Sequence, residues 1–173
     1  MNNYLLDGFE SDRLCFRKVN PSDAKFWLPF HEDPRTSEFW DGLPTDPTTA
    51  CEQDLERTFY RYSNNLGGKM ALISKTTGEF VGQSGLLVQE VDARKELEIA
   101  YSLLPKFWKQ GYAIEAASAC KEYALSKKLS HSLISIIHKD NIPSQKVALK
   151  NGMRYDTTTD YHGNPVYIFR IHI

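Results

Sequence analysis

The stretch FWKQGYAIEAA, residues 107–117, combines residue types that can bind an anion. Two bulky aromatic residues give way to Gly111, and a run of helix-forming residues follows directly. The first N–H groups of a helix have no partner within it and the helix dipole is positive there, so a glycine at this point lets the backbone approach phosphate oxygens. The stretch therefore favours a phosphate-binding turn, although a glycine between a strand and a helix is also a common simple connection.

Other motifs for phosphate binding or nucleophilic catalysis are incomplete. The GGK at residues 67–69 lacks the upstream glycine of a P-loop, and no G-x-G-x-x-G occurs. Ser84 lies in GQSG, but Leu86 stands where a nucleophile elbow needs its second glycine. We therefore interpret Ser84 as a strand residue, and a serine hydrolase that depends on it is the weakest of our hypotheses.

Histidines and cysteines give no metal motif. His31 precedes two carboxylates and His138 lies near Asp140, but neither pairs with a second histidine at helical spacing. The 3 cysteines lie far apart, which fits neither a disulfide framework nor a zinc site. We predict no metal.

Length and composition predict one domain. The chain has 173 residues, of which 41% are hydrophobic, and this suffices for a sizeable core. We expect residues 1–173 to form a single domain in the cytoplasm, because no apolar run approaches the roughly 20 residues of a membrane helix and no signal peptide begins the sequence. Residues 67–173 hold 14 basic and 10 acidic side chains, which suits an anionic ligand or reflects a chance split. No basic block is dense enough to predict binding to nucleic acid, and we expect no membrane partner.

The hydrophobic pattern predicts an α+β sheet with helices on both faces. The expected strands are 13–19, 67–75, 78–91, 96–104, 131–139 and a closing hairpin within 153–173 that turns at Gly163-Asn164. Helices are expected at 20–30, at 50–65 with Thr48 or Thr49 as its cap, from Gly111 to about Lys127, and from Pro143 to Gly152.

Two long segments in this order, EIAYSLLPKFWKQGYAIEA and NIPSQKVALKNGM, closely resemble the signature of the GNAT acetyltransferases. The chain is most similar to the branch of the ribosomal-protein-alanine N-acetyltransferases (RimJ/RimL-like), which the opening ESDRLCFRKVNPSDA also resembles. The resemblance covers nearly the whole chain. It implies a mixed, mostly antiparallel sheet of about seven strands whose parallel strands four and five, here 98–104 and 132–139, are splayed apart to admit acetyl-CoA.

The resemblance also implies which residues bind acetyl-CoA. Backbone N–H groups would hold the pyrophosphate at Lys109, Gln110, Gly111, Tyr112, Ala113 and Ile114. The pantetheine arm would contact Ser102, Leu103, Leu104, Asn141 and Ser144. The wider superfamily usually has Gln or Arg where this chain has Trp108, a change that leaves backbone contacts possible.

Glu98 matches the strand glutamate that many relatives use to deprotonate the acceptor amine. Strand alternation places Glu96 and Glu98 on one face, so both would point to the site or both to solvent. Ser144 matches a serine that can donate a proton to the leaving thiolate, or it serves only the helix start. Many relatives have a tyrosine where this chain has Ala148, and Tyr155 and Tyr161 are possible substitutes.

Residues 31–46 carry five carboxylates and one arginine around Phe39 and Trp40. In the family this loop borders the acceptor site, where a cationic amine would be attracted; alternatively the aromatic residues pack on the second helix. We predict acetyl transfer to a primary amine, either a protein N-terminus or a small cationic amine, by a monomer or homodimer. The alternative is a non-catalytic acyl-CoA-binding module.

Overall fold

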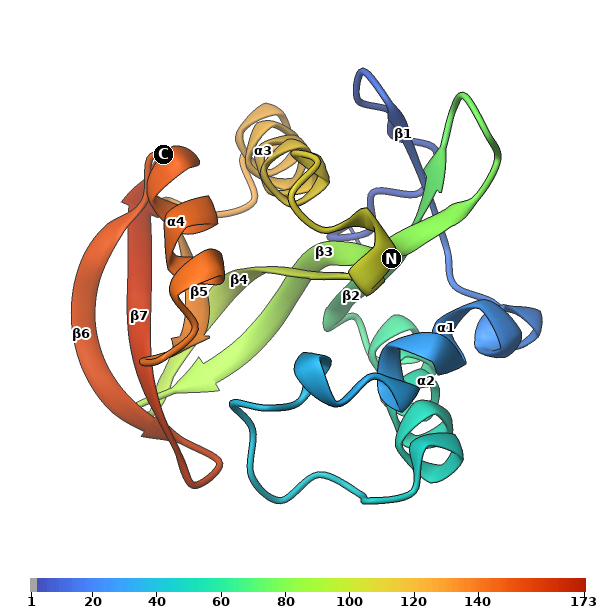
Figure 1. Cartoon of the computed structure of the whole chain (residues 1–173). Helices are drawn as coiled ribbons and strands as arrows, with labels where there is room; N and C mark the ends of the chain where they lie inside the picture. The colour runs from blue at the N-terminus through green and yellow to red at the C-terminus, as the bar shows by residue number, and fades with distance from the viewer. Residues whose placement is uncertain (1–2) are drawn as a thin grey trace.

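A seven-stranded sheet organises the chain, and its strand order is β1-β2-β3-β4-β5-β7-β6 (Figure 1). The computed structural model describes residues 3–173. The strands are β1 Leu14–Arg17, β2 Gly67–Ser74, β3 Phe80–Val91, β4 Arg94–Leu103, β5 Ser132–His138, β6 Arg154–Tyr161 and β7 Asn164–His172. Neighbouring strands are antiparallel except β4 and β5, which are parallel, so the predicted mixed sheet is confirmed.

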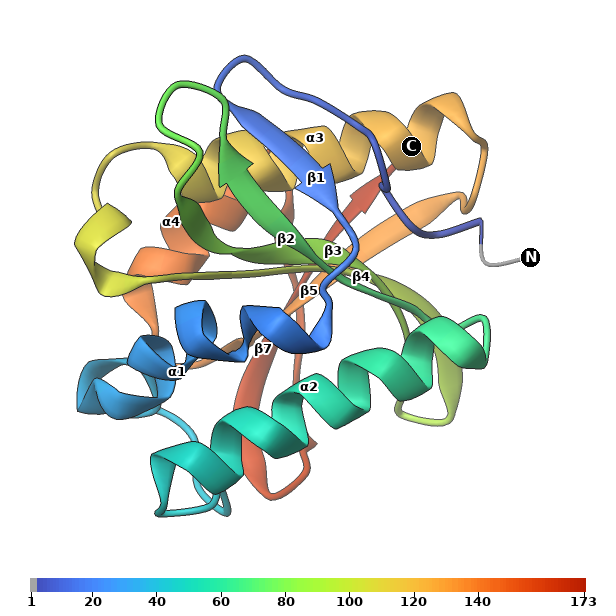
Figure 2. The ribbon, with the colours of Figure 1, turned by 90° about the vertical axis from the view of Figure 1, so that its right-hand side faces the viewer.

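Helices cover both faces of this sheet (Figure 2). They are α1 Ala24–Glu32, α2 Pro47–Ser63, α3 Tyr112–Ser126 and α4 Ile142–Lys150, with short 3₁₀ turns at Pro21–Asp23, Pro34–Thr36 and Pro105–Phe107. The view of Figure 2 shows α3 above the sheet and α1 and α2 below it. The buried side of α3 consists of small residues, among them Ala116, Ala117 and Cys120, which let the helix lie close to β3 and β4. Across residues 3–173, no helix combines the length and the apolar character needed to cross a membrane.

Several element ends lie one to four residues from their predicted positions, and three of these differences change a cap, a turn or a helix start. Asp46, and not Thr48 or Thr49, caps α2, because its carboxylate accepts the N–H of Thr49 at 2.9 Å and Pro47 occupies the first helical position. The hairpin between β6 and β7 turns at His162-Gly163, both with positive φ, so Asn164 belongs to β7. Helix α4 begins at Ile142, one residue before the predicted Pro143.

The parallel strands part almost as soon as they meet. The only register pair between β4 and β5 is Glu98 opposite Ile134. One residue further along, the Ser135 hydroxyl donates to the carbonyl of Ile99 at 2.8 Å and fills the point of divergence. Beyond it the remaining residues of β4 have no strand partner on this side, so an extended ligand can pair with them. The predicted splay is confirmed.

Candidate active site

The glycine loop, which we define as residues 108–114, joins the end of β4 to α3. Lys109 and Gly111 have φ of 60° and 84°, so the chain turns through two left-handed residues before the helix begins. Within α3 the N–H of Glu115 donates to the carbonyl of Gly111 at 3.2 Å, and the N–H groups before it belong to the unpaired first turn. The loop thus offers the positive end of a 15-residue helix to an anion, and these residues fit a pyrophosphate.

The Trp108 side chain bonds the glycine loop to the end of β4. Its indole N–H donates to the carbonyl of Leu103 at 2.9 Å, and the guanidinium of Arg35 lies 5.1 Å from its ring centre. The side chain of Trp108, which replaces the usual Gln or Arg, therefore has a structural role. What this loop offers to an anion is its backbone N–H groups.

Glu98 lies at the point where β4 and β5 part, and only 8% of its surface is exposed. One carboxylate oxygen accepts the side-chain N–H of Gln89 at 2.7 Å. The Gln89 carbonyl oxygen in turn accepts from the guanidinium of Arg61 at 2.9 Å, so an amide separates the carboxylate from the cation. Burial raises the pKa of Glu98, while the bond from Gln89 and the charge of Arg61 oppose the rise. A carboxylate in this state has an increased affinity for protons.

Glu96 lies on the same face of β4 as Glu98, as the alternation predicts, yet its environment is different. Both of its carboxylate oxygens accept from the guanidinium of Arg170, at 2.9 and 2.7 Å. This bidentate pair neutralises Glu96 and fixes its side chain. Of the two glutamates, Glu98 is the one with no ion pair in the described chain.

The first turn of α4 faces β4 across the splay. The side chain of Asn141 caps this helix by accepting the N–H of Ser144 at 3.2 Å. The Tyr101 hydroxyl reaches from β4 to the carbonyl of Ser144 at 2.8 Å. The Ser144 hydroxyl is half-buried and makes no hydrogen bond within residues 3–173, so the serine backbone supports the helix start while its hydroxyl remains available.

The loop between α1 and α2 crosses the sheet and reaches β5 and the β6–β7 hairpin (Figure 1). The Phe39 ring stacks on His138 with centroids 5.7 Å apart, and Trp40 packs on an apolar cluster that includes Ile134. The N–H of Asp41 donates to the side chain of Asn164 at 2.9 Å. Phe39 and Trp40 therefore pack on the sheet beside Glu98 and not on α2, and we call this surface, with Glu98, Ile134, Trp40 and Tyr161, the Glu98 face.

The family of the protein follows from its match to a known domain. The family model of the acetyltransferase (GNAT) domain matches residues 13–154. The chain belongs to the GNAT acetyltransferase family. Acetyltransferases of this family use acetyl-CoA, and the expected fold and family are confirmed.

Relatives of this GNAT protein cover almost its whole length. The Bacillus subtilis protein YkkB is 30% identical over 164 residues, which are 92% of each chain. An acetyltransferase from Agrobacterium tumefaciens has the same fold, with a TM-score of 0.80 at 22% identity over 95% of this chain and 94% of its own. RimL, a ribosomal L7/L12 alpha-N-protein acetyltransferase in complex with coenzyme A, superposes with a TM-score of 0.74 at 14% identity over 94% and 96% of the two chains.

The other residues that the sequence suggested for catalysis lie in different environments in this GNAT protein. Tyr161 packs on the same apolar cluster as Trp40, and burial together with the charge of Glu98 raises its pKa to about 12. Tyr155 is exposed on β6, where its hydroxyl contacts Thr158. Ser84 is fully buried in β3 and its hydroxyl donates to the carbonyl of Ala100, so the interpretation as a strand residue is confirmed. Within residues 3–173 no group of three or more His, Cys, Asp or Glu side chains could hold a metal ion.

Sequence reasoning missed Gln89, which contacts Glu98, and Arg61, which contacts Gln89. Gln89 could have been found from the register of the β3–β4 hairpin, because a two-residue turn at Asp92-Ala93 places Gln89 opposite Glu96 and diagonal to Glu98. No local signal identifies Arg61, which reaches this position only because α2 crosses beneath the sheet.

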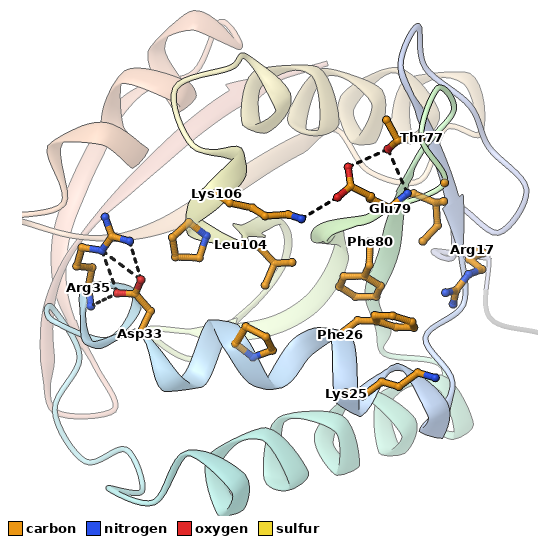
Figure 3. A pocket seen from close by; sticks show the side chains of 14 residues that line it. Arg17, Lys25, Phe26, Asp33, Arg35, Thr77, Glu79, Phe80, Leu104 and Lys106 are labelled. Carbon is orange, nitrogen blue, oxygen red and sulfur yellow. Dashed lines mark hydrogen bonds and ion pairs between the residues drawn. The ribbon is translucent and has the colours of Figure 1, made fainter.

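Two cavities of this GNAT protein lie near the ends of the proposed site. One of about 800 Å³ lies between α1, the β2–β3 turn and the end of β4 (Figure 3). Lys106 is paired with Glu79 at 2.7 Å and Arg35 with Asp33 at 2.6 Å along its walls. Of the residues expected at the active site, only Leu104 lines it. A second cavity of about 450 Å³ lies under the α1–α2 loop and includes Trp40.

Proposed function

We propose that this protein transfers the acetyl group of acetyl-CoA to a primary amine, with Glu98 as general base. The observation that carries the proposal is the state of Glu98, a buried carboxylate that has no ion pair among residues 3–173 and lies at the point where the parallel strands part. Acetyl-CoA supplies an acetyl thioester, in which the C–S bond breaks as the C–N bond to the amine forms. The amine loses one proton in this exchange, and the leaving thiolate gains one.

Backbone groups would hold the acetyl donor. The N–H groups of Lys109 to Ile114 suit the pyrophosphate, because they surround the start of α3. The end of β4 and the residue after it, Ser102 to Leu104, suit the pantetheine arm, which would pair as an added strand on the side of β4 that turns away from β3, with Asn141 at the opposite side of the splay. The Leu103 carbonyl already accepts from Trp108 and the Leu104 N–H already donates to Val81, so neither group would bind the arm.

Side chains would move the protons. Glu98 would accept a proton from the amine as it attacks, and burial favours this because it raises the proton affinity of the carboxylate. The Ser144 hydroxyl, at the first turn of α4, would donate to the leaving thiolate. The Tyr161 phenol stays protonated at neutral pH and is the second candidate for this donor.

A protein N-terminus is the acceptor that we favour. An α-amine has a pKa of roughly 7.7 to 8.0, whereas a lysine amine near 10.4 must give up far more of its protonation before it can attack. The likeness to RimL, an alpha-N-protein acetyltransferase, supports the same choice. Phe39 and Trp40 would border the amine, and the acidic residues of their loop would attract its positive charge.

Release of the coenzyme A thiol from acetyl-CoA tests this proposal. The panel contains peptides with free N-termini, the same peptides with blocked N-termini and one internal lysine, free amino acids and polyamines. We expect release that depends on the free N-terminus. Binding of acetyl-CoA without release from any amine would contradict the proposal and favour the acyl-CoA-binding module.

A further inference from the structure

The first turn of α3 contains a carboxylate that would oppose an anionic ligand. Glu115 lies four residues after Gly111, close to the N–H groups proposed for the pyrophosphate. Burial acts to raise its pKa, but hydrogen bonds from Ser11 and Arg13 hold the pKa of Glu115 below its ordinary value. The side chain is therefore ionised at neutral pH, and its charge must be compensated for a diphosphate to bind nearby.

Arg13, the residue just before β1, supplies this compensation. Its Nε donates to one carboxylate oxygen of Glu115 at 2.7 Å. The other oxygen accepts both the backbone N–H of Arg13 and the Ser11 hydroxyl, each at 2.7 Å. The negative charge of Glu115 is thus turned toward β1 and satisfied by three donors.

The same arginine also binds the glycine loop directly. Its Nη1 donates to the carbonyl of Gln110 at 3.0 Å, and its guanidinium lies 4.1 Å from the ring centre of Tyr112. The Gln110 carbonyl and the Gly111 N–H belong to one planar trans peptide and point in opposite directions. Fixing the carbonyl on Arg13 therefore directs the N–H of Gly111 to the other side of the loop.

The absence of a side chain at Gly111 leaves room for the guanidinium of Arg13. A Cβ at this position would lie 3.2 Å from the Nη2 of Arg13, and the φ of 84° already disfavours any other residue. Two segments about 100 positions apart in the sequence are thus built to fit each other.

We propose that Arg13 is a positioning residue for acetyl-CoA, which neutralises Glu115 and orients the Gln110-Gly111 peptide toward the pyrophosphate. The inference rests on the proposed function, because it assumes that the glycine loop binds that group. It adds a side chain from the segment before β1 to a site otherwise made of backbone.

A comparison of two acetyl donors tests this role. Acetyl-CoA carries the pyrophosphate, whereas S-acetylpantetheine lacks it. For Arg13→Met we expect kcat/KM with acetyl-CoA to fall roughly tenfold, since a charge-assisted contact is lost. Its kcat/KM with S-acetylpantetheine should stay within about twofold of the unmodified protein. An equal loss with both donors, or no loss with either, would overturn the proposal.

Arg17→Met is the matched control. Arg17, the last residue of β1, makes a similarly close ion pair with Asp23, at 2.8 Å, on another part of the molecule. This variant should lose thermal stability without changing the ratio between the two donors. If Arg13→Met does not fold, Arg13→Lys keeps the charge but cannot bind Glu115 and Gln110 with one planar group, and it should show the same selective loss.

Calorimetry with coenzyme A separates this inference from the proposed function. If no amine supports thiol release from either donor, the transferase proposal fails. The affinity for coenzyme A then still decides the role of Arg13, because it should fall roughly tenfold in Arg13→Met and remain unchanged in Arg17→Met. Equal affinities in the two variants would overturn the role.

Discussion

The glycine loop and the Glu98 face are built in opposite ways. The loop is one continuous segment whose proposed ligands are backbone N–H groups, and its shape follows from two residues with positive φ. The Glu98 face combines side chains from β4, β5, the β6–β7 hairpin and the loop after α1. A site made of backbone tolerates changes of side chain, as Trp108 shows, whereas an assembled site depends on every element that carries one of its side chains.

This contrast predicts that substitutions in the two regions change different kinetic constants. Changes in the glycine loop should act on the KM for acetyl-CoA. Changes on the Glu98 face should act on kcat and on the KM for the amine. A variant that changes both sets equally would show that the regions are coupled through the fold.

The largest effect is expected for Glu98→Gln. The amide keeps the size of the side chain but cannot accept a proton, so kcat should fall by about a hundredfold or more while the KM for acetyl-CoA stays the same. Steady-state thiol release with the preferred amine measures both constants. Glu96→Gln is the control, because Glu96 is bound to Arg170 and should lose stability with little loss of kcat.

The same variant should be more stable than the unmodified protein at neutral pH. Because burial raises the pKa of Glu98 in the folded state, the fold retains a proton that the unfolded chain has lost, and stability falls as the pH rises through the folded pKa. Glu98→Gln removes this loss. Chemical denaturation should show a gain in the free energy of unfolding at pH 8 that disappears below the pKa of an unfolded glutamate, about 4. A variant that is less stable than the unmodified protein at pH 8 would contradict a raised pKa of Glu98 in the folded state.

The next largest effect is expected for Gln89→Leu. Removing the N–H that Glu98 accepts should raise the pKa of the carboxylate further, and the acidic limb of the kcat/KM profile should move up by about one pH unit. Gln83→Leu is the control on the same strand, because the Gln83 amide is fully buried and neither of its atoms has a partner. That variant should leave the profile unchanged and increase stability. An unchanged profile in Gln89→Leu would place Glu98 outside the proton transfer.

The same contrast explains what could be predicted from the sequence. The order of strands and helices along the chain and the position of the glycine loop follow from short-range patterns, since alternation, helix starts and Gly111 are visible within a few residues. The splay of the two parallel strands is expected only from the resemblance to the GNAT family. The bond from Arg61 to Gln89 depends on how α2 crosses the sheet, and the bond that holds Asp41 depends on a hairpin whose turn lies one residue earlier than expected. These contacts join residues more than 25 positions apart, and no local pattern encodes them.

A smaller effect is expected for Gly111→Ala. A left-handed φ costs alanine about 1 kcal/mol, and the added Cβ would press on Arg13. The KM for acetyl-CoA should rise roughly fivefold, by the tenfold change that 1.4 kcal/mol produces, with the KM for the amine unchanged. Gly8→Ala has the same backbone cost at φ 82° with open space around its Cβ, so it should affect neither constant.

The smallest effect is expected for Asn164→Ala. This substitution removes the oxygen that accepts the N–H of Asp41, and with it the bond that holds the loop of Phe39 and Trp40 to the β6–β7 hairpin. One neutral hydrogen bond contributes about 1 kcal/mol, so the KM for the amine should rise roughly threefold to fivefold. Asn164→Asp keeps an accepting oxygen and should show a smaller rise. Because Asn164 lies on the far side of β5 from the glycine loop, an unchanged KM for acetyl-CoA is the decisive result. A rise in that constant as well would mean that the loop after α1 orders both regions together.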